Sequence, residues 1–202
     1  MIIVILTFIH SILGDCTQDT TLSNAKYVDS EYGSDTYSCT YSYKCKTLSR
    51  AYSQLSNSAG TVVLLKGTHS VSAGLSSSKT ITIQSCNPDE ETILSVSGGI
   101  TLFSLSSQTL TLTGFSIAVT SASCLFYASS GTSTLTLDSM KIYGEGGQKS
   151  ITYLLFVDYY IDNFKCSNSY ISNFTTSGHP VFQLYDGYSP ETRTYIAKKI
   201  TI

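Results

Sequence analysis

The chain has 202 residues, of which 13% are charged, and its formal net charge at pH 7 is -2. This balance excludes the basic footprint of a nucleic-acid-binding protein and a polybasic membrane patch. Polarity comes from hydroxyl groups instead: Ser and Thr dominate, and 15 Tyr accompany them without any Trp. Thr and Tyr suit solvent-facing strands because both fit a pleated surface.

The chain begins with an apolar segment, residues 1–14, which gives way abruptly to polar residues from Asp15 onward. The segment is shorter than the roughly 20 apolar residues of a membrane span, and Gly14 is a small residue suited to cleavage. We therefore predict a signal peptide over residues 1–14 and an extracellular or cell-surface location. Because no Lys or Arg follows Met1, a buried N-terminal strand is the alternative. A membrane anchor is expected only outside this chain, since no later apolar run is long enough to cross a membrane.

Residues 15–26 form a polar lead-in, and the predicted domain covers residues 27–202. It opens with a turn at Gly33, Ser34 and Asp35. The six cysteines are an even number behind a predicted secretion signal, so disulfides are permitted. Among them only Cys39 and Cys45 lie close in sequence. We predict either a disulfide between these two cysteines or reduced, buried thiols.

A short helix is predicted over residues 47–56, and strands follow it. Its apolar residues recur at i, i+3, i+4 and i+7, at Leu48, Ala51, Tyr52 and Leu55, and Thr47 is placed to cap the first turn. Residues 57–60 are expected to end the helix.

Four segments then have the pattern of strands. Residues 61–67 are an apolar run ended by glycine, typical of a strand buried on both faces. Residues 79–85 alternate, with isoleucine on one face and Thr80, Thr82 and Gln84 on the other. Residues 92–97 and 100–106 are separated by a Gly–Gly turn.

From about residue 100 the chain repeats a unit of one strand, a turn and a second strand. The copies begin with the letters LF, LF, LL and VF, and they end at Ile117, Ile142, Ile171 and Ile202. Periods of 20 to 50 residues indicate solenoids, and units made only of strands favour a β-solenoid. A β-sandwich is the alternative, but the persistence of the repeat counts against it.

We therefore predict an all-β, right-handed parallel β-helix with a short N-terminal capping helix. Stacked coils pair their backbones and enclose a continuous apolar interior, whereas one coil alone cannot. The helix lies where such a stack needs a cap. The last strand ends without a turn or polar tail, so a fragment of a longer protein is expected.

The order of motifs over residues 27–85 resembles the opening of pectin-lyase-like right-handed β-helix domains. The segments that carry this resemblance are YVDSEYGSD, CKTLSRAYSQL, TVVLLKGTHSV and SSSKTITIQS. The resemblance implies the fold; it does not imply a function, because this fold carries both enzymes and non-catalytic surface proteins. The general character is that of secreted or surface β-helix proteins of protists. Gly98, Gly99 and Ile100 also resemble the GGI element of polymorphic outer-membrane-protein repeats, without the FxxN element that accompanies it.

No catalytic, cofactor-binding or metal-binding residue is predicted. The polysaccharide-cleaving enzymes that this fold resembles carry paired aspartates, a GHG element or a catalytic arginine. Here no Asp–Asp pair exists, His179 lies in SGHP, and the two arginines are Arg50, on the predicted helix, and Arg193. The serines at 76–78 lack a GxSxG elbow.

The remaining charged candidates have simpler interpretations. Asp158 and Asp162 share the even spacing of one strand face, but two solvated carboxylates are expected rather than a catalytic pair. The acidic run 89–91 is a solvated turn, with weak calcium binding as the alternative. His69 and His179 are interpreted as surface histidines.

Two features remain that suit a surface protein. Asn173 begins an N-x-T sequon, so we expect glycosylation there on a secretory route. Tyrosines offer stacking faces for sugars or protein partners, at Tyr37, Tyr41, Tyr43, Tyr153, Tyr159, Tyr160, Tyr185 and Tyr188. The leading hypothesis is a non-catalytic structural or adhesive module that binds glycans or extracellular proteins. The alternative is a carbohydrate-active enzyme, a lyase or a hydrolase, whose catalytic coils lie beyond this chain.

Overall fold

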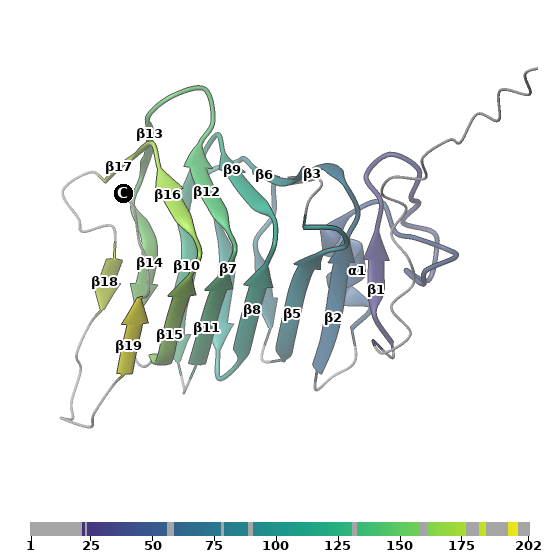
Figure 1. Ribbon diagram of the computed structural model, residues 1–202, viewed down its shortest axis with the longest axis horizontal. Coiled ribbons are helices and arrows are strands. Elements are labelled where there is room, and N and C mark those ends of the chain that lie inside the picture. Colours follow the sequence, from purple (N-terminus) through teal and green to yellow (C-terminus); the bar gives the residue numbers. More distant parts are fainter. Residues whose placement is uncertain are drawn as a thin grey trace, which may run out of the picture.

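A computed structural model describes residue 22 and residues 24–55, 59–77, 79–88, 91–130, 133–157, 161–176, 182–184 and 194–197. Its strands form long parallel sheets that run along the molecule (Figure 1). The chain winds through about 4 turns, and each turn contributes strands to the same sheets. The predicted parallel β-solenoid with one short helix is therefore confirmed.

Three sheets, here called A, B and C, make up the walls of the solenoid. Sheet A contains β1 (Lys26–Val28), β2 (Ala59–Leu64), β5 (Thr80–Ser85), β8 (Thr109–Thr113), β11 (Ser133–Asp138), β15 (Ile161–Ser167) and β19 (Thr194–Ala197). Sheet B contains β3 (Gly67–Val71), β6 (Thr92–Val96), β9 (Ser116–Val119), β12 (Lys141–Gly144) and β16 (Tyr170–Ser172). Sheet C contains β4 (Leu75–Ser77), β7 (Ile100–Ser106), β10 (Ala122–Ser130), β14 (Tyr153–Val157) and β18 (Phe182–Leu184). A small pair joins β13 (Lys149–Ile151) to β17 (Phe174–Thr176).

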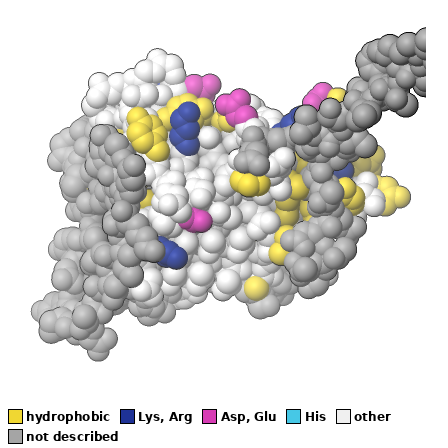
Figure 2. Space-filling view, viewed as in Figure 1, with side chains coloured by type: hydrophobic (Ala, Val, Ile, Leu, Met, Phe, Trp, Pro, Cys, Tyr) yellow, Lys and Arg dark blue, Asp and Glu magenta, His cyan; other side chains and the backbone are white. Residues whose placement is uncertain are grey.

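The interior is filled by columns of apolar side chains, one from each coil. In sheet B the predicted repeat isoleucines stack in register, Ile117 beside Ile142 and Ile142 beside Ile171, and all three are buried. Ile202 lies outside the described residues. In sheet A alternate residues face inward, so Ile81 and Ile83 are fully buried, while the outer face carries mainly uncharged polar side chains (Figure 2). Burial of these columns is the main stabilising contribution of the fold.

The helix α1 (Leu48–Ser53) covers the N-terminal end of the interior, as predicted (Figure 1). The hydroxyl of Thr47 accepts a hydrogen bond from the Arg50 amide at 3.2 Å, which is the expected cap. The four apolar residues of the helical pattern are all buried, and the helix packs against β1, β2 and β3. The helix ends at Ser53, before the expected residue 56, and residues 59–60 already belong to β2.

The loop before the helix is fixed by one carboxylate and one disulfide. Asp35 accepts hydrogen bonds from the amides of Lys46 and Thr47 and from the Thr47 hydroxyl, at 2.9 to 3.0 Å. The disulfide between Cys39 and Cys45 confirms the bridged reading of these two cysteines. Cys86 is also disulfide-bonded.

The end of one predicted strand differs from the structure. The apolar strand predicted over residues 61–67 ends at Leu64, and Gly67 begins the next strand, β3, because the chain turns from sheet A to sheet B at residues 65–66. The predicted signal peptide, residues 1–14, lies outside the described residues. Within the described part of the chain, no helix combines the length and apolar character needed to cross a membrane.

Candidate functional site

The corner between sheets A and B has the same backbone geometry in three successive coils. Gly114, Ser139 and Asn168 each have a positive φ, of 76°, 55° and 52°. Each is the third residue before a repeat isoleucine. The corners are linked along the solenoid, since the amide of Gly114 donates to the Asp138 carbonyl at 3.2 Å and that of Ser139 to the Ser167 carbonyl at 3.0 Å. The repeated left-handed residue bends each coil sharply and leaves a hollow beside the corner.

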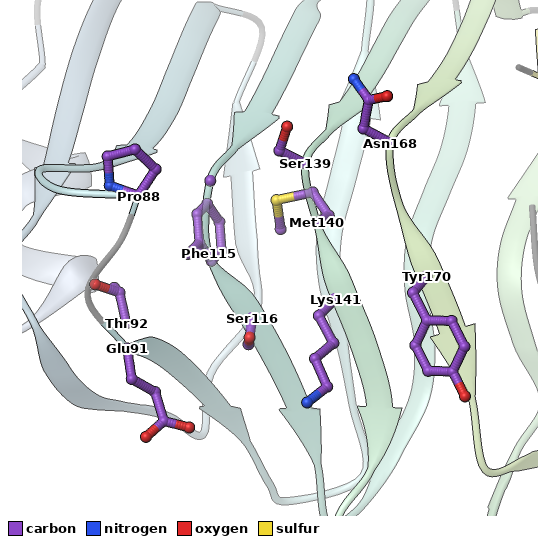
Figure 3. A pocket seen from close by; sticks show the side chains of 11 residues that line it. Pro88, Glu91, Thr92, Phe115, Ser116, Ser139, Met140, Lys141, Asn168 and Tyr170 are labelled. Carbon is purple, nitrogen blue, oxygen red and sulfur yellow. The ribbon is translucent and has the colours of Figure 1, made fainter. Parts of the chain in front are cut away.

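This hollow is an open groove of about 650 Å³ that crosses four coils (Figure 3). The coils contribute, in order, Pro88, Glu91 and Thr92; Gly114, Phe115 and Ser116; Ser139, Met140 and Lys141; and Asn168 and Tyr170. Phe115, Met140 and Thr92 are buried and form its floor. Neighbouring strands lie about 4.7–4.9 Å apart, so the groove follows the solenoid axis rather than a single strand.

One row of outward side chains gives the groove its profile. Ser116 lies in register between Ile93 and Lys141, and Lys141 lies beside Tyr170. The small serine stands between larger side chains and therefore deepens the groove at its centre. The Tyr170 ring is 44% exposed at one end, and in Figure 3 the Lys141 and Tyr170 side chains extend along the same edge.

The electrostatics of the groove are nearly balanced. Glu91 and Lys141 are its only charged lining residues among those described. The Lys141 ammonium lies 5.1 Å from the ring centroid of Tyr143, a cation–π distance. Partial burial, with the nearby carboxylates of Glu145 and Glu91, raises the pKa of the Tyr143 phenol. Tyr143 is therefore neutral at physiological pH. Among the described residues that line the groove, Lys141 is the one that carries a positive charge.

A fixed amide lies at the corner. Asp138 accepts hydrogen bonds from the Ser167 hydroxyl at 2.6 Å and from the Asn168 side-chain amide at 3.1 Å. The second of these hydrogen bonds orients the exposed Asn168 side chain beside the groove.

The described residues that line the groove include one carboxylate. Hydrolysis of a glycosidic bond uses two carboxyl groups on either side of the bond, whereas Glu91 is the single carboxylate among the described lining residues. In the described part of the chain, no three His, Cys, Asp or Glu side chains lie close enough to hold a metal ion.

The structure separates the other sequence candidates. Asn173 is exposed, with φ 60°, at the bend between β16 and β17. Tyr37 and Tyr43 pack edge to face in the N-terminal loop, 5.7 Å apart, and are 43% and 60% exposed. Tyr41 packs against Tyr27 at 5.3 Å. Other candidates, or their side chains, lie outside the described residues: Asp89, Glu90, Asp158, Tyr159, Tyr160, Asp162, His179, Tyr185, Tyr188 and Arg193.

The prediction of a surface histidine at His69 is wrong. His69 is 2% exposed, because in sheet B it pairs with Leu94, which pairs with Ile117. It thus fills the first position of the inward column that leucine and isoleucine occupy in later coils. Its Nε2 donates to the Leu65 carbonyl at 2.7 Å, and its buried Nδ1 has no hydrogen-bond partner among the described residues.

Acid is expected to destabilise the protein through His69. Burial lowers its pKa below the usual value of about 6.5, although the Leu65 carbonyl and Asp29 act in the opposite direction. The unfolded state therefore binds more protons between the two pKa values, and stability falls as the pH drops below about 6.5, with the loss complete below the folded-state pKa. Melting temperatures measured on both sides of this window should fall less in His69→Leu than in the wild type. Equal acid losses in both proteins would contradict the assignment.

Apart from Glu91, which belongs to the acidic run 89–91, sequence reasoning missed the groove residues. Tyr170 and Lys141 were not among the candidates, yet each immediately precedes a repeat isoleucine, as Ser116 does. That shared position could have indicated a row of outward side chains, because the residues on either side of an inward isoleucine face outward on a strand.

Comparison with known protein families, with curated proteins and with solved structures finds no match to this chain.

Proposed function

We propose that this chain is a non-catalytic binding module whose groove, between sheets A and B, holds a neutral saccharide chain. The observation that carries the proposal is the composition of the groove: an exposed tyrosine ring at one end, an apolar floor, and a row of hydroxyl, amide and charged groups along it. Sugars present apolar C–H faces and many hydroxyl groups, so they match a surface of this mixed character. The open shape favours a chain ligand over an enclosed small molecule.

Removing the aromatic ring at the end of the groove should weaken glycan binding. We expect Tyr170→Ala to lower affinity by about tenfold, because truncating an aromatic anchor at a binding site commonly costs more than 1 kcal/mol. Tyr170→Phe should retain most of the affinity, since it keeps the stacking face. The measurement is isothermal titration with the neutral oligosaccharide that binds best on a glycan array.

The control is Tyr32→Ala, which removes a tyrosine that is 79% exposed in the N-terminal loop, away from the groove. Ser116→Tyr fills the centre of the groove and should abolish binding while the melting temperature stays near that of the wild type. The proposal fails if no neutral glycan binds, or if Tyr32→Ala weakens binding as much as Tyr170→Ala does. Polyuronates serve as the charged comparison, because one lysine balanced by one glutamate gives no preference for a polyanion.

The enzymatic alternative makes a different prediction in the same samples. A hydrolase or lyase would release new reducing ends or unsaturated products from the bound glycan. The described lining residues of the groove supply one carboxylate, that of Glu91, so we expect no turnover from this chain. Turnover that disappears in Glu91→Gln would replace the binding proposal with an enzymatic one.

We also propose that the protein is secreted or displayed at the cell surface. The disulfides at Cys39–Cys45 and at Cys86 support this, because such bonds persist in oxidising compartments. The exposed sequon at Asn173 suits glycosylation after entry to the secretory pathway. Expression in a eukaryotic secretory host should yield protein that shifts in mass on glycosidase treatment, whereas Asn173→Gln should show no shift. Retention inside the cell, or an unshifted wild type, would count against this location.

A relation to pectin-lyase-like β-helices remains part of the proposal. Its support is the motif order over residues 27–85, together with coils that pass through three parallel sheets. The contacts of Asp35 with Lys46 and Thr47 give two of these motifs a shared structural role, since they join the turn at residues 33–35 to the start of the helix.

A further inference from the structure

The outer face of sheet A carries a regular array of threonines, here called the threonine face. Its members are eight outward threonines of four neighbouring strands: Thr61, Thr80, Thr82, Thr109, Thr111, Thr113, Thr134 and Thr136. Gln84 and Asp138 flank Thr113 at the edge of this array. On β5, β8 and β11 they form the same Thr-x-Thr unit. Such a unit places two hydroxyls on one face of a strand.

The pairing of strands aligns these units into straight rows. Thr61 pairs with Thr82, and Thr82 pairs with Thr111. Thr136 pairs with Thr111, and Thr134 pairs with Thr109. The rows therefore repeat at about 4.7–4.9 Å across the strands and at about 6.7 Å along them. No register shift interrupts the pairing of β8 with its neighbours.

The hydroxyls of this face are not used by the fold. None of the eight makes a side-chain hydrogen bond to another described residue. Several threonines elsewhere do, such as Thr120, whose hydroxyl donates to the Val96 carbonyl at 2.9 Å, and Thr92, which bonds to Ser85 at 3.0 Å. The threonine face thus directs its hydrogen-bonding capacity to the solvent.

The two main rows of the array, which contain Thr111 and Thr109, carry no charged residue from β2 to β11, and Asp138 lies at the edge of the array beside Thr113. The middle of this face carries few charged or hydrophobic side chains (Figure 2), and the two main rows meet polar replacements only at β15, with Asn163 and Lys165. A β-branched side chain has a restricted χ1, so each hydroxyl and methyl repeats its neighbour's position. A strand-paired backbone holds this geometry without further ordering cost on binding.

We propose that the threonine face binds the surface of ice crystals. A two-dimensional array of binding groups does not strengthen the binding of a flexible peptide or of a single sugar chain. It does strengthen the binding of a crystal surface, because the groups of that surface also recur in two dimensions at a similar period. The spacing of the array is close to that of equivalent water oxygens on ice faces. A mineral surface would favour charged groups, and a crystalline polysaccharide would favour aromatic ones; this face presents hydroxyls and methyls, which order water at fixed positions.

The test is ice-recrystallisation inhibition and ice-crystal shaping by the purified protein, with Thr111→Lys as the disrupting variant. Thr111 lies in the centre of the array, so a long charged side chain there should remove most of the activity. Thr68→Lys is the matched control, because Thr68 is an exposed outward threonine on sheet B. Circular dichroism and the melting temperature should show that both variants fold.

The proposal is overturned if the wild type affects ice no more than an unrelated protein at equal concentration, or if Thr111→Lys is as active as Thr68→Lys. Sedimentation with insoluble cellulose but no effect on ice would also overturn it, in favour of a crystalline polysaccharide. This inference does not depend on the groove, since Tyr170→Ala should leave the effect on ice unchanged.

Discussion

Replacing Phe126 by alanine is expected to lower the free energy of unfolding by about 3 to 5 kcal/mol. Phe126 is fully buried, and its ring stacks on that of Phe103 with centroids 5.8 Å apart and an interplanar angle of 7°. It lies on β10 between Phe103 of β7 and Leu155 of β14. Its removal opens a cavity between two coils, and the hydrogen-bonded strands on either side prevent collapse into it. Urea denaturation at pH 7.5 measures the change.

The control for this prediction is Ser104→Ala, on the neighbouring strand with its side chain outward. A substitution there should change the free energy of unfolding by no more than about 0.5 kcal/mol. Phe126→Leu keeps much of the buried volume and should cost less than Phe126→Ala. A loss below about 1 kcal/mol for Phe126→Ala would mean that the coils relax around the gap and that the core is not close-packed.

The repeat could be predicted from the sequence because an inward column requires the same type of residue, an apolar one, in each coil. At the second residue of the first three copies, Phe103, Phe126 and Leu155 form one inward column. The isoleucines Ile117, Ile142 and Ile171 form another. The inward column of the first coil was not predicted from the sequence. It carries His69 where later coils carry leucine or isoleucine, and a polar residue at the end of a short strand gives no sign that its neighbours will bury it.

The candidate site was harder to predict from the sequence than the fold, because it depends on the corners between sheets A and B rather than on the strands. Gly114, Ser139 and Asn168 share one position, three residues before a repeat isoleucine, but three different residue types do not show that they share a left-handed turn. Only their left-handed backbones and cross-coil hydrogen bonds show this. The groove also depends on the smallness of Ser116 beside Lys141, a contrast that appears only once the strand register is known.

Replacing Gly33 by alanine is expected to destabilise the protein by about 3 kcal/mol, the upper end of the usual cost of overpacking. A Cβ at this position would overlap the carbonyl oxygens of Cys45 and Asp29. Both oxygens are held in place, because the Cys45 carbonyl accepts from the Asp29 amide at 2.8 Å and the Asp29 carbonyl accepts from the Gly33 amide at 3.0 Å. The methyl group can enter only if these hydrogen bonds shift.

A second glycine separates this steric effect from backbone strain. Gly146 has φ 71°, and a Cβ there would meet no atom within 4 Å. Gly146→Ala should therefore cost only the roughly 1 kcal/mol of a left-handed alanine. Thermal melts of the two variants should show a larger loss for Gly33→Ala, with or without reduction of the Cys39–Cys45 disulfide. If the two losses are equal, the loop at residues 33–45 yields to the methyl group, and the close contact between Gly33 and Cys45 is not what fixes this loop against the first coil.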